Sequence, residues 1–146
     1  MSLFSKNLSM RTLDLLERGM NASVMRRKVL ANNIANVSVP HFKRSEVSFE
    51  ADLKRAVESE KASAHAMPLR TDDSRHISMS PFRVRDYRRV QPRVHIDALS
   101  SMRNDGNNVD MEDESMKIAR NQLRYSLMAN RVGRQFSHLN QLMRLA

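Results

Sequence analysis

The groups in this chain that could carry out acid–base or metal chemistry are five histidines and two clusters of carboxylates. The histidines are scattered, and none forms an HExxH pair or another spacing that suits zinc. They are His41, His65, His76, His95 and His138. The clusters Asp72-Asp73 and Glu112-Asp113-Glu114 stand near no glycine-rich loop or nucleophile motif. We therefore predict no enzyme activity, small-molecule substrate, cofactor or metal site.

The composition of the 146-residue chain excludes further kinds of chemical site and indicates a class of fold. The chain has no Cys, so it has no disulfide, thiolate zinc site or Cys nucleophile. Its 3 Gly leave little backbone for a phosphate cradle. It has 11 Met but only 5% aromatic residues, a balance typical of helix packing in which Met fills irregular gaps. The length suits one domain of ordinary size.

The beginning of the chain does not resemble a cleaved signal peptide. Lys6, Arg11 and Asp14 interrupt its apolar pattern. No apolar run in the chain is long enough to span a bilayer. If the protein leaves the cytoplasm, we expect it to use a route that reads no cleavable signal.

The formal net charge of +9 is unevenly distributed. Residues 1–44 carry 8 Lys or Arg against 2 Asp or Glu, residues 45–108 carry 11 against 10, and residues 109–146 carry 6 against 4. The triplet Arg26-Arg27-Lys28 would spread around most of a helical turn. A solvated helix face therefore explains it better than a stripe that binds nucleic acid.

Two long amphipathic helices are predicted at the ends of the chain, over residues 9–36 and 111–146. In the first, apolar residues recur at steps of three and four, which predicts one buried face. They include Leu13, Leu16, Met20, Leu30, Ile34 and Val37. Pro40 disfavours helical geometry at Val39, which predicts the end of this helix.

The second helix has a clear predicted start. Asp105-Gly106 marks a turn, Asp110 can act as N-cap, and acidic residues occupy the first turn. Its expected apolar stripe continues to the end of the chain and lacks a C-cap, so the helix should fray unless a partner buries it. The stripe comprises Met116, Ala119, Leu123, Leu127, Met128, Val132, Phe136, Leu139, Leu142, Met143 and Ala146.

The middle of the chain shows weaker signals. The stretch SFEADLKRAVESE predicts a short helix capped by Ser48, whose apolar face includes Phe49, Leu53, Ala56 and Val57. Residues 59–81 are polar and rich in breaks. Residues 82–96 alternate apolar and charged side chains, which predicts two short extended segments or a hairpin.

We therefore expect a mainly α fold. Its long N- and C-terminal helices pair as an antiparallel coiled coil, with a short helix and a small extended or β segment in the middle. Residues 1–44 and 99–146 form the two halves of the core domain, and residues 45–98 form the segment between them.

Two motifs resemble those of a known family. Leu30–Arg44, LANNIANVSVPHFKR, followed by Val47, Phe49 and Leu53, resembles the N-terminal signature of bacterial flagellar axial proteins. Asp105–Asp110, DGNNVD, followed by Glu114, Asn121 and Tyr125, is similar to the C-terminal signature of the proximal rod subunits. The resemblance covers roughly residues 8–54 and 99–146.

The first motif departs from the family pattern. The usual Thr-Pro-Gly-Tyr is replaced by Val39-Pro40-His41-Phe42, so a hydroxyl, a glycine and a phenol are missing. Histidine tolerates a positive φ better than most non-glycine residues, which keeps a turn at His41 possible.

The resemblance implies a structural subunit of the flagellar basal-body rod, with terminal helices that pair around a hollow, helically arranged shaft. It implies export by the flagellum's own secretion apparatus to a rod in the periplasm. The implied partners are other rod subunits, copies of the chain, the basal-body adaptor, the membrane ring and the export apparatus. The implied assembly residues are Leu30, Asn32, Asn33, Ile34, Asn36, Pro40, Phe42, Lys43, Asp105, Gly106, Asn107, Val109, Glu114, Asn121, Tyr125, Leu139 and Leu142.

Alternatives remain open on the sequence alone. Asn32, Asn33 and Asn36 can bond backbone groups at the end of their own helix, or can contact a neighbouring subunit. Arginines with Phe82 and Tyr87 could contact phosphates and stack on bases, as in a basic helical nucleic-acid-binding protein. A helical adaptor or export-chaperone bundle is the third possibility. The rod hypothesis predicts no specific nucleic acid.

Overall fold

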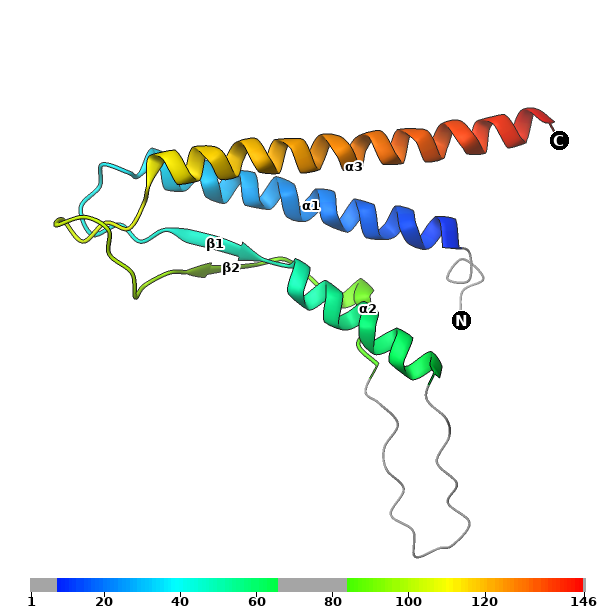
Figure 1. Cartoon of the computed structure of the whole chain (residues 1–146), viewed down its shortest axis with the longest axis horizontal. Helices are drawn as coiled ribbons and strands as arrows, with labels where there is room; N and C mark the ends of the chain where they lie inside the picture. Colours follow the sequence, from blue (N-terminus) through cyan, green and yellow to red (C-terminus); the bar gives the residue numbers. More distant parts are fainter. Residues whose placement is uncertain (1–7, 66–83, 146) are drawn as a thin grey trace, which may run out of the picture. The chain divides into compact units, whose positions relative to one another are not determined.

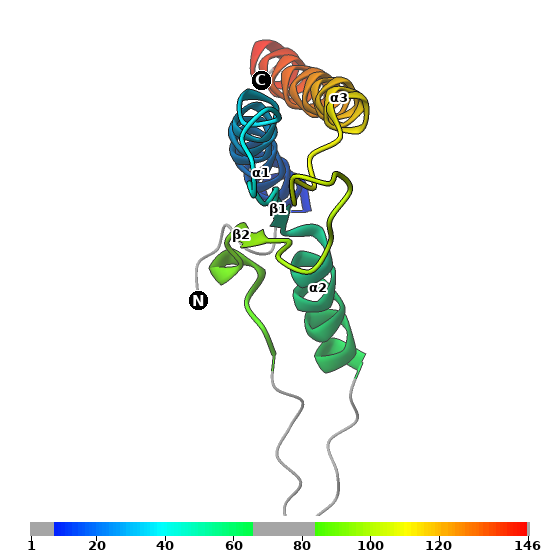
Figure 2. The same ribbon diagram turned by 90° about the vertical axis from the view of Figure 1, so that its left-hand side faces the viewer.

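Two long helices dominate the computed structural model, which describes residues 8–65 and 84–145 (Figure 1). Helix α1 spans Leu8–Ala35 and helix α3 spans Met111–Leu145. They lie side by side and run in opposite directions, as Figures 1 and 2 show. The helices predicted over residues 9–36 and 111–146 are confirmed to within one residue at each end.

Helix α1 ends in a series of turns. The N–H of Asn36 lies 3.2 Å from the Asn32 carbonyl and 3.1 Å from the Asn33 carbonyl, and the N–H of Val39 lies 3.1 Å from the Asn36 carbonyl. Pro40 follows directly. Because proline has no N–H and disfavours helical geometry in the residue before it, a helix could not continue past Val39, and α1 itself ends four residues earlier, at Ala35.

Helix α3 begins at a side-chain cap. Asp110 Oδ1 accepts the N–H of Glu112 at 2.9 Å and that of Asp113 at 3.4 Å. These bonds satisfy backbone donors that have no partner inside the helix, so the predicted N-cap is confirmed. The acidic first turn of the helix also suits its positive end.

Strands β1, Ser45–Ser48, and β2, Arg93–Ile96, form a two-stranded antiparallel sheet (Figure 1). Strand β1 follows the end of α1, and β2 leads into the loop before α3. Of the two short extended segments or hairpin predicted for residues 82–96, the extended segment at the end of the stretch is confirmed as β2, but a hairpin is wrong, because β2 pairs with β1 instead. Residues 87–89 form a 3-10 turn, so no strand lies beside β2 in the described part of that stretch.

The chain divides into two compact units, one made of the chain up to Val47 together with the chain from Val94, the other of Ser48–Arg93. The second unit contains α2, Glu50–His65, and the 3-10 helix η2, Tyr87–Arg89. In it, Ser59 Oγ donates to the Ala56 carbonyl at 2.7 Å and accepts the N–H of Arg85 at 3.0 Å. This hydroxyl links α2 to the segment before η2.

Helix α2 differs from its prediction at both ends. The N–H of Leu53 bonds the Phe49 carbonyl at 2.9 Å, so Phe49 rather than Ser48 occupies the N-cap position. The helix also continues to His65, although breaks were predicted from residue 59 onward. Residues 61–65 contain Lys and Ala but no Gly or Pro, which explains why the helix persists.

The interior of the first unit is small and mostly polar. In its described part, the buried apolar residues are Ala22, Leu30 and Val109. Leu13, Leu16 and Met20, which belong to the predicted apolar face of α1, are only half-buried. The buried polar residues of this unit are Ser23, Asn33, Asn107, Asn108, Glu114 and Asn121.

The single apolar stripe predicted on α3 is wrong in part, because Met116, Leu123 and Leu127 lie on the opposite side of the helix from Val132. Met128, Val132 and Leu139 are half-buried. Six others are at least 51% exposed, namely Met116, Leu123, Leu127, Phe136, Leu142 and Met143. Steps of three and four accommodate either side of a helix that turns about 100° per residue, so periodicity alone did not separate the two sides.

Candidate functional site

Asn33, near the end of α1, joins three parts of the first unit. Its Nδ2 donates to the Ser45 carbonyl at 2.9 Å and to Oε2 of Glu114 at 2.8 Å. Its Oδ1 accepts the N–H of Ser45 at 3.0 Å. The exposed fraction is 0% for Asn33 and 1% for Glu114. Every polar hydrogen and the oxygen of the amide are used within the chain, so Asn33 ties α1 to β1 and α3.

Glu114 also binds a cation on its own helix. Lys117 Nζ lies 3.0 Å from Glu114 Oε1 and 2.8 Å from Asp113 Oδ2. Arg44, just before β1, lies 3.1 Å from Asp97 and 3.8 Å from Asp113. A buried carboxylate is costly unless it is paired and hydrogen-bonded. Glu114 meets this need, with an amide on one oxygen and an ammonium on the other.

These contacts shift several pKa values. The hydrogen bond from Lys117 is the main cause that holds the pKa of Asp113 below its usual range. Partial burial by itself lowers the pKa of Lys117, but its bonds to Asp113 and Glu114 outweigh this effect and raise that pKa. The pKa of Asp97 is lowered mainly by the hydroxyl of Ser100. All three shifts favour the charged forms of these side chains, which hold together the polar cluster of Asn33, Arg44, Asp97, Asp113, Glu114 and Lys117.

Asn107, in the loop before α3, caps the end of α1. Its Nδ2 lies 3.2, 3.1 and 2.9 Å from the carbonyls of Asn36, Val37 and Val39. Its Oδ1 accepts the N–H of Val109 at 2.7 Å. The Asn36 carbonyl is at the end of α1, where carbonyls have no partner inside the helix, and the other two carbonyls belong to the turns that follow. The second signature motif thus supplies the donor that closes the helix carried by the first.

Asn108 holds the turn that follows β2. Its Oδ1 accepts the N–H of Arg44 at 2.7 Å, and its Nδ2 donates to the Asp97 carbonyl at 2.8 Å and to Ser100 Oγ at 3.0 Å. Lys43 Nζ donates to the Ser100 carbonyl at 2.8 Å. The turn is therefore anchored from both signature motifs.

His41 adopts a left-handed backbone conformation, with φ of 59°. Its N–H donates to the Asp105 carbonyl at 3.0 Å. Gly106 also has a positive φ, 77°, and a Cβ added there would lie 2.8 Å from His41 Nδ1. The turn at His41 that the sequence left possible is present, and Gly106 leaves the room that the imidazole occupies.

Contacts between α1 and α3 continue along the helices. Asn121 Nδ2 donates to the Ser23 carbonyl at 2.9 Å, and both residues are buried. Farther along, a Cβ added at Gly19 would lie 2.9 Å from Met128 Sδ, so the helices approach closely there. Among the described residues, Asn121 Oδ1 is the one buried side-chain polar atom without a hydrogen-bond partner.

The predicted assembly residues fall into several groups. Leu30, Asn33, Asn107, Val109, Glu114 and Asn121 are buried. Asn36 Nδ2 donates to the Asn32 carbonyl at 2.8 Å and to Asn32 Oδ1 at 3.0 Å, so these two amides bond locally. The half-buried members are Ile34, Phe42, Lys43, Asp105, Gly106 and Leu139, and the exposed members are Pro40, Tyr125 and Leu142.

The prediction omitted several residues that the structure places in this cluster. Arg44 and Asn108 stand inside the two motifs, so their positions were a usable signal. Lys117 follows Glu114 by three residues, the spacing of neighbours on a helix surface. Ser23 interrupts an apolar stripe at helical spacing, which is also a signal. Asp97 lies outside both motifs, and no local pattern points to it.

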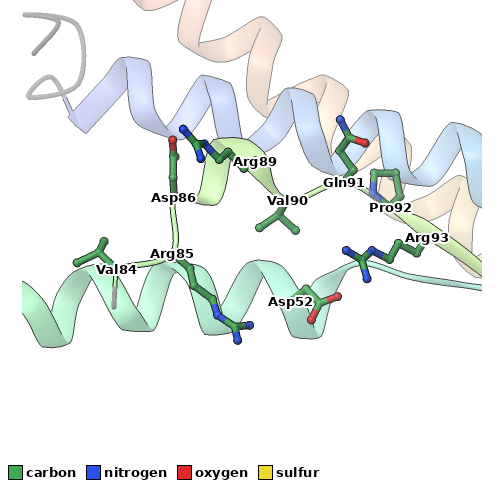
Figure 3. A pocket seen from close by; sticks show the side chains of 9 residues that line it. All are labelled: Asp52, Val84, Arg85, Asp86, Arg89, Val90, Gln91, Pro92 and Arg93. Carbon is green, nitrogen blue, oxygen red and sulfur yellow. The ribbon is translucent and has the colours of Figure 1, made fainter. Parts of the chain in front are cut away.

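The described residues hold no group of three or more His, Cys, Asp or Glu side chains that could bind a metal ion. Asp72-Asp73, His76 and the His65 side chain lie outside the described residues. In the second unit, Arg85 and Arg93 extend toward the part of α2 that carries Asp52 (Figure 3). The pocket there is lined by Asp52, Val84, Arg85, Asp86, Arg89, Val90, Gln91, Pro92 and Arg93. This lining brings no nucleophile and base together.

None of the helices in residues 8–65 and 84–145 combines the length and apolar character required to cross a membrane.

Known proteins are similar over nearly the whole chain. The flagellar basal body rod protein FlgB of Borrelia hermsii is 39% identical over 134 residues, which cover 92% of this chain and 96% of that protein. FlgB of Borreliella burgdorferi is 35% identical over 89% of this chain and 93% of its own length. FlgB of Bacillus subtilis is 31% identical over 95% and 94%. No protein-family model matches. With these identities and this coverage, the chain belongs to the FlgB family of flagellar basal body rod proteins.

Proposed function

We propose that the chain is a structural subunit of the flagellar basal-body rod. In this proposal, α1 and α3 form an antiparallel coiled coil, and subunits polymerise helically into a hollow shaft that serves motility. The support is the rod-protein name of the three relatives together with the paired terminal helices. These relatives support neither the nucleic-acid nor the adaptor alternative.

The observation that carries the proposal is that few apolar side chains of the first unit are buried, whereas many on α3 are exposed to solvent. In the described part of the first unit, three apolar residues are buried: Ala22, Leu30 and Val109. On α3 alone, the exposed large apolar residues are Met111, Met116, Leu123, Tyr125, Leu127, Phe136, Leu142 and Met143. Large exposed apolar surfaces mark sites of interaction with other proteins. A subunit that is completed by its neighbours in an open, head-to-tail assembly has this distribution.

We assign the predicted assembly residues to two roles. The buried polar group, Asn33, Asn107, Glu114 and Asn121, holds the helix pair of one subunit together. The exposed group, represented by Tyr125 and Leu142, contacts neighbouring subunits. Assembly then buries the apolar side chains that a single subunit leaves in water, which offsets the loss of conformational freedom when the helices become ordered.

The remaining expectations follow from this role. The proposed partners are other rod subunits, copies of the chain, the basal-body adaptor, the membrane ring and the flagellar export apparatus. The proposed location is the rod in the periplasm, reached without a cleavable signal. We propose that residues 1–44 and 99–146 supply the assembling core and that residues 45–98 form a separate segment. The role is structural rather than catalytic.

Deletion of the gene tests the proposal. We expect a non-motile strain whose basal bodies lack rods in electron micrographs, with both properties restored by the full-length gene. Intact rods in the deletion strain would refute a rod function. A Leu142→Gln variant should keep the helix content of the wild type in circular dichroism but reduce rod number.

A further inference from the structure

The side of α3 that points away from α1 carries a second set of aligned residues. We call it the outer α3 face, and its residues are Met116, Arg120, Leu123, Leu127, Arg131 and Arg134. At about 100° per residue, all six lie within about a quarter of the helix circumference. Met116 and Leu123 each come two residues after a side chain that bonds α1, Glu114 and Asn121 respectively. They are therefore about 200° around the helix from the contact with α1.

The apolar members of this face are open to solvent. The exposed fraction is 52% for Met116, 65% for Leu123 and 64% for Leu127. Arg120 Nη2 lies 3.0 Å from Met116 Sδ, so even the first of them is bordered by a guanidinium. These apolar residues lie on a helix that is already paired with α1 on its other side. We therefore expect a second partner to bury them.

The charge on α3 indicates which kind of partner can bind this face. From Ser115 to Leu145 the helix has no Asp or Glu, whereas six Lys or Arg occur there: Lys117, Arg120, Arg124, Arg131, Arg134 and Arg144. Within residues 8–65 and 84–145, Lys117 is the one cation of α3 that forms an ion pair. A partner that buried Arg131 and Arg134 without carboxylates would leave guanidinium groups desolvated and unpaired, which is strongly unfavourable.

We propose that the outer α3 face docks an acidic amphipathic helix from a different rod subunit. This inference rests on the proposed rod function and specifies the chemistry of one neighbour. Apolar side chains of the partner cover Leu123 and Leu127, and its Asp or Glu residues pair with Arg131 and Arg134. Guanidinium and carboxylate groups can form two parallel hydrogen bonds, which would fix the register of the two helices.

A second copy of this chain fits the outer α3 face poorly. Helix α1 contains five Lys or Arg against two Asp or Glu, and α3 has no acid beyond its first turn. Two of the acids on α1 and α2 already have a cation nearby, since Asp14 of α1 lies 3.1 Å from Arg18 and Glu58 of α2 lies 3.8 Å from Lys54. Packing either helix of a copy on this face would set like charges against each other.

Nucleic acid and membrane also fit less well than a protein helix. Phosphates would leave Leu123 and Leu127 uncovered. A helix that lies in a membrane surface keeps its charges on the polar side. Here Arg134 follows Met116 by eighteen residues, which is five helical turns, so it stands in line with the apolar strip.

The first experiment is a charge reversal in the full-length chain. Arg131→Glu combined with Arg134→Glu should reduce rods per cell by about tenfold or more, because like charges across an interface oppose binding. Arg131→Lys combined with Arg134→Lys keeps the charge and should retain most rods. Circular dichroism and the amount of exported subunit should match the wild type in both variants. Normal rod numbers in the Glu variant would overturn the inference.

The second experiment identifies the occupant. A photo-crosslinking residue at position 123 in assembled basal bodies should attach to a peptide of another rod subunit that has more Asp and Glu than Lys and Arg. Reversing those acids to Lys should restore rods in the Arg131→Glu, Arg134→Glu strain. The control position is Gln122, which lies about 100° around the helix. Attachment to a second copy, to lipid or to nucleic acid, or yields no higher than at Gln122, would refute the proposed partner.

The outcomes separate this inference from the rod function itself. If the deletion strain keeps its rods, the function is wrong. If the deletion abolishes rods while the Glu variant builds them normally, the function stands and the acidic partner is wrong.

Discussion

Asn33 Nδ2 and Glu114 Oε2 lie 2.8 Å apart, although 81 residues separate them in the sequence. One comes from the N-terminal signature motif and the other from the C-terminal one. Neither side chain is accessible to solvent beyond 1%. The two motifs that suggested the family are therefore one physical unit inside the subunit, at the junction of α1, β1 and α3.

Removal of the Asn33 amide should destabilise the junction. Asn33→Ala leaves the N–H and carbonyl of Ser45 without their side-chain partners and takes a donor from Glu114. We expect a loss of about 2–4 kcal/mol in the free energy of unfolding, since buried polar groups become unsatisfied. Urea unfolding followed by circular dichroism measures the loss.

Asn21→Ala is the matched control, because it makes the same substitution at an exposed position of α1. It should change the unfolding free energy by less than about 0.5 kcal/mol. Equal stability of the two variants would mean that the Asn33 contacts contribute nothing.

Asn107→Ala should loosen the end of α1. The change removes the donor shared by three carbonyls and the acceptor of the Val109 N–H. We expect a destabilisation of about 1–3 kcal/mol, in the range of lost caps and unsatisfied buried groups. Amide exchange of Val109, followed by NMR, should accelerate. Exchange that remains as slow as in an Asn104→Ala control, made at an exposed neighbouring position, would contradict the capping role.

Stability should fall in acid because of Asp97 and Asp113. Both have a lowered pKa in the folded chain. A lowered folded-state pKa contributes stability above the unfolded value, about 3.9, and that stability is lost as pH falls through the folded value. The urea concentration at the unfolding midpoint of the wild type should therefore decrease when the pH is lowered below about 4. Asp113→Asn should flatten this drop, and a drop of unchanged size would exclude Asp113 as a cause.

Lys117 should act at the opposite end of the pH range. Its pKa is raised in the folded chain, so its contribution is complete below the unfolded value and is lost as pH rises through the folded one. The wild type should thus lose stability above about pH 10.5, the usual range of lysine. Lys117→Arg keeps a charge at that pH and should shift the loss upward. Urea unfolding at a series of alkaline pH values measures this loss. If stability is lost at the same pH in both proteins, Lys117 is not its cause.

Gly106 and His41 should be energetically coupled. Gly106→Ala places a methyl group 2.8 Å from His41 Nδ1 at a positive φ, and should cost about 1–3 kcal/mol. In a His41→Gly background the steric part disappears, so the same change should cost less. A double-mutant cycle measures the difference, and additive effects would show that the two residues do not interact.

Local signals predicted the ends of the long helices well. Pro40 and the Asp110 cap act on their own neighbours, so the sequence alone indicates where α1 ends and α3 begins. The partner of β2 was not predictable in this way. Residues 93–96 pair with residues 45–48, and no pattern within a short window records a contact across that distance.

The polar interior was only partly predictable. The motifs indicated Asn33, Asn107, Glu114 and Asn121, but not the partner of each side chain. Lys117 and Ser23 were missed because their roles depend on which side of each helix faces the other. A spacing of three and four residues indicates that a helix has an apolar side. It does not indicate which of two apolar sides packs against the other helix.

From the sequence separation within the junction we expect its long-range contacts to form late in folding. Asn121 meets the Ser23 carbonyl across 98 residues, and Asn107 reaches the end of α1 across about 70. Contacts between such distant residues form late, because a long loop must close first. A chain that lacks residues 107–121 cannot make these contacts, so the bonds of Asn107 at the end of α1 form only when the last third of the polypeptide is present.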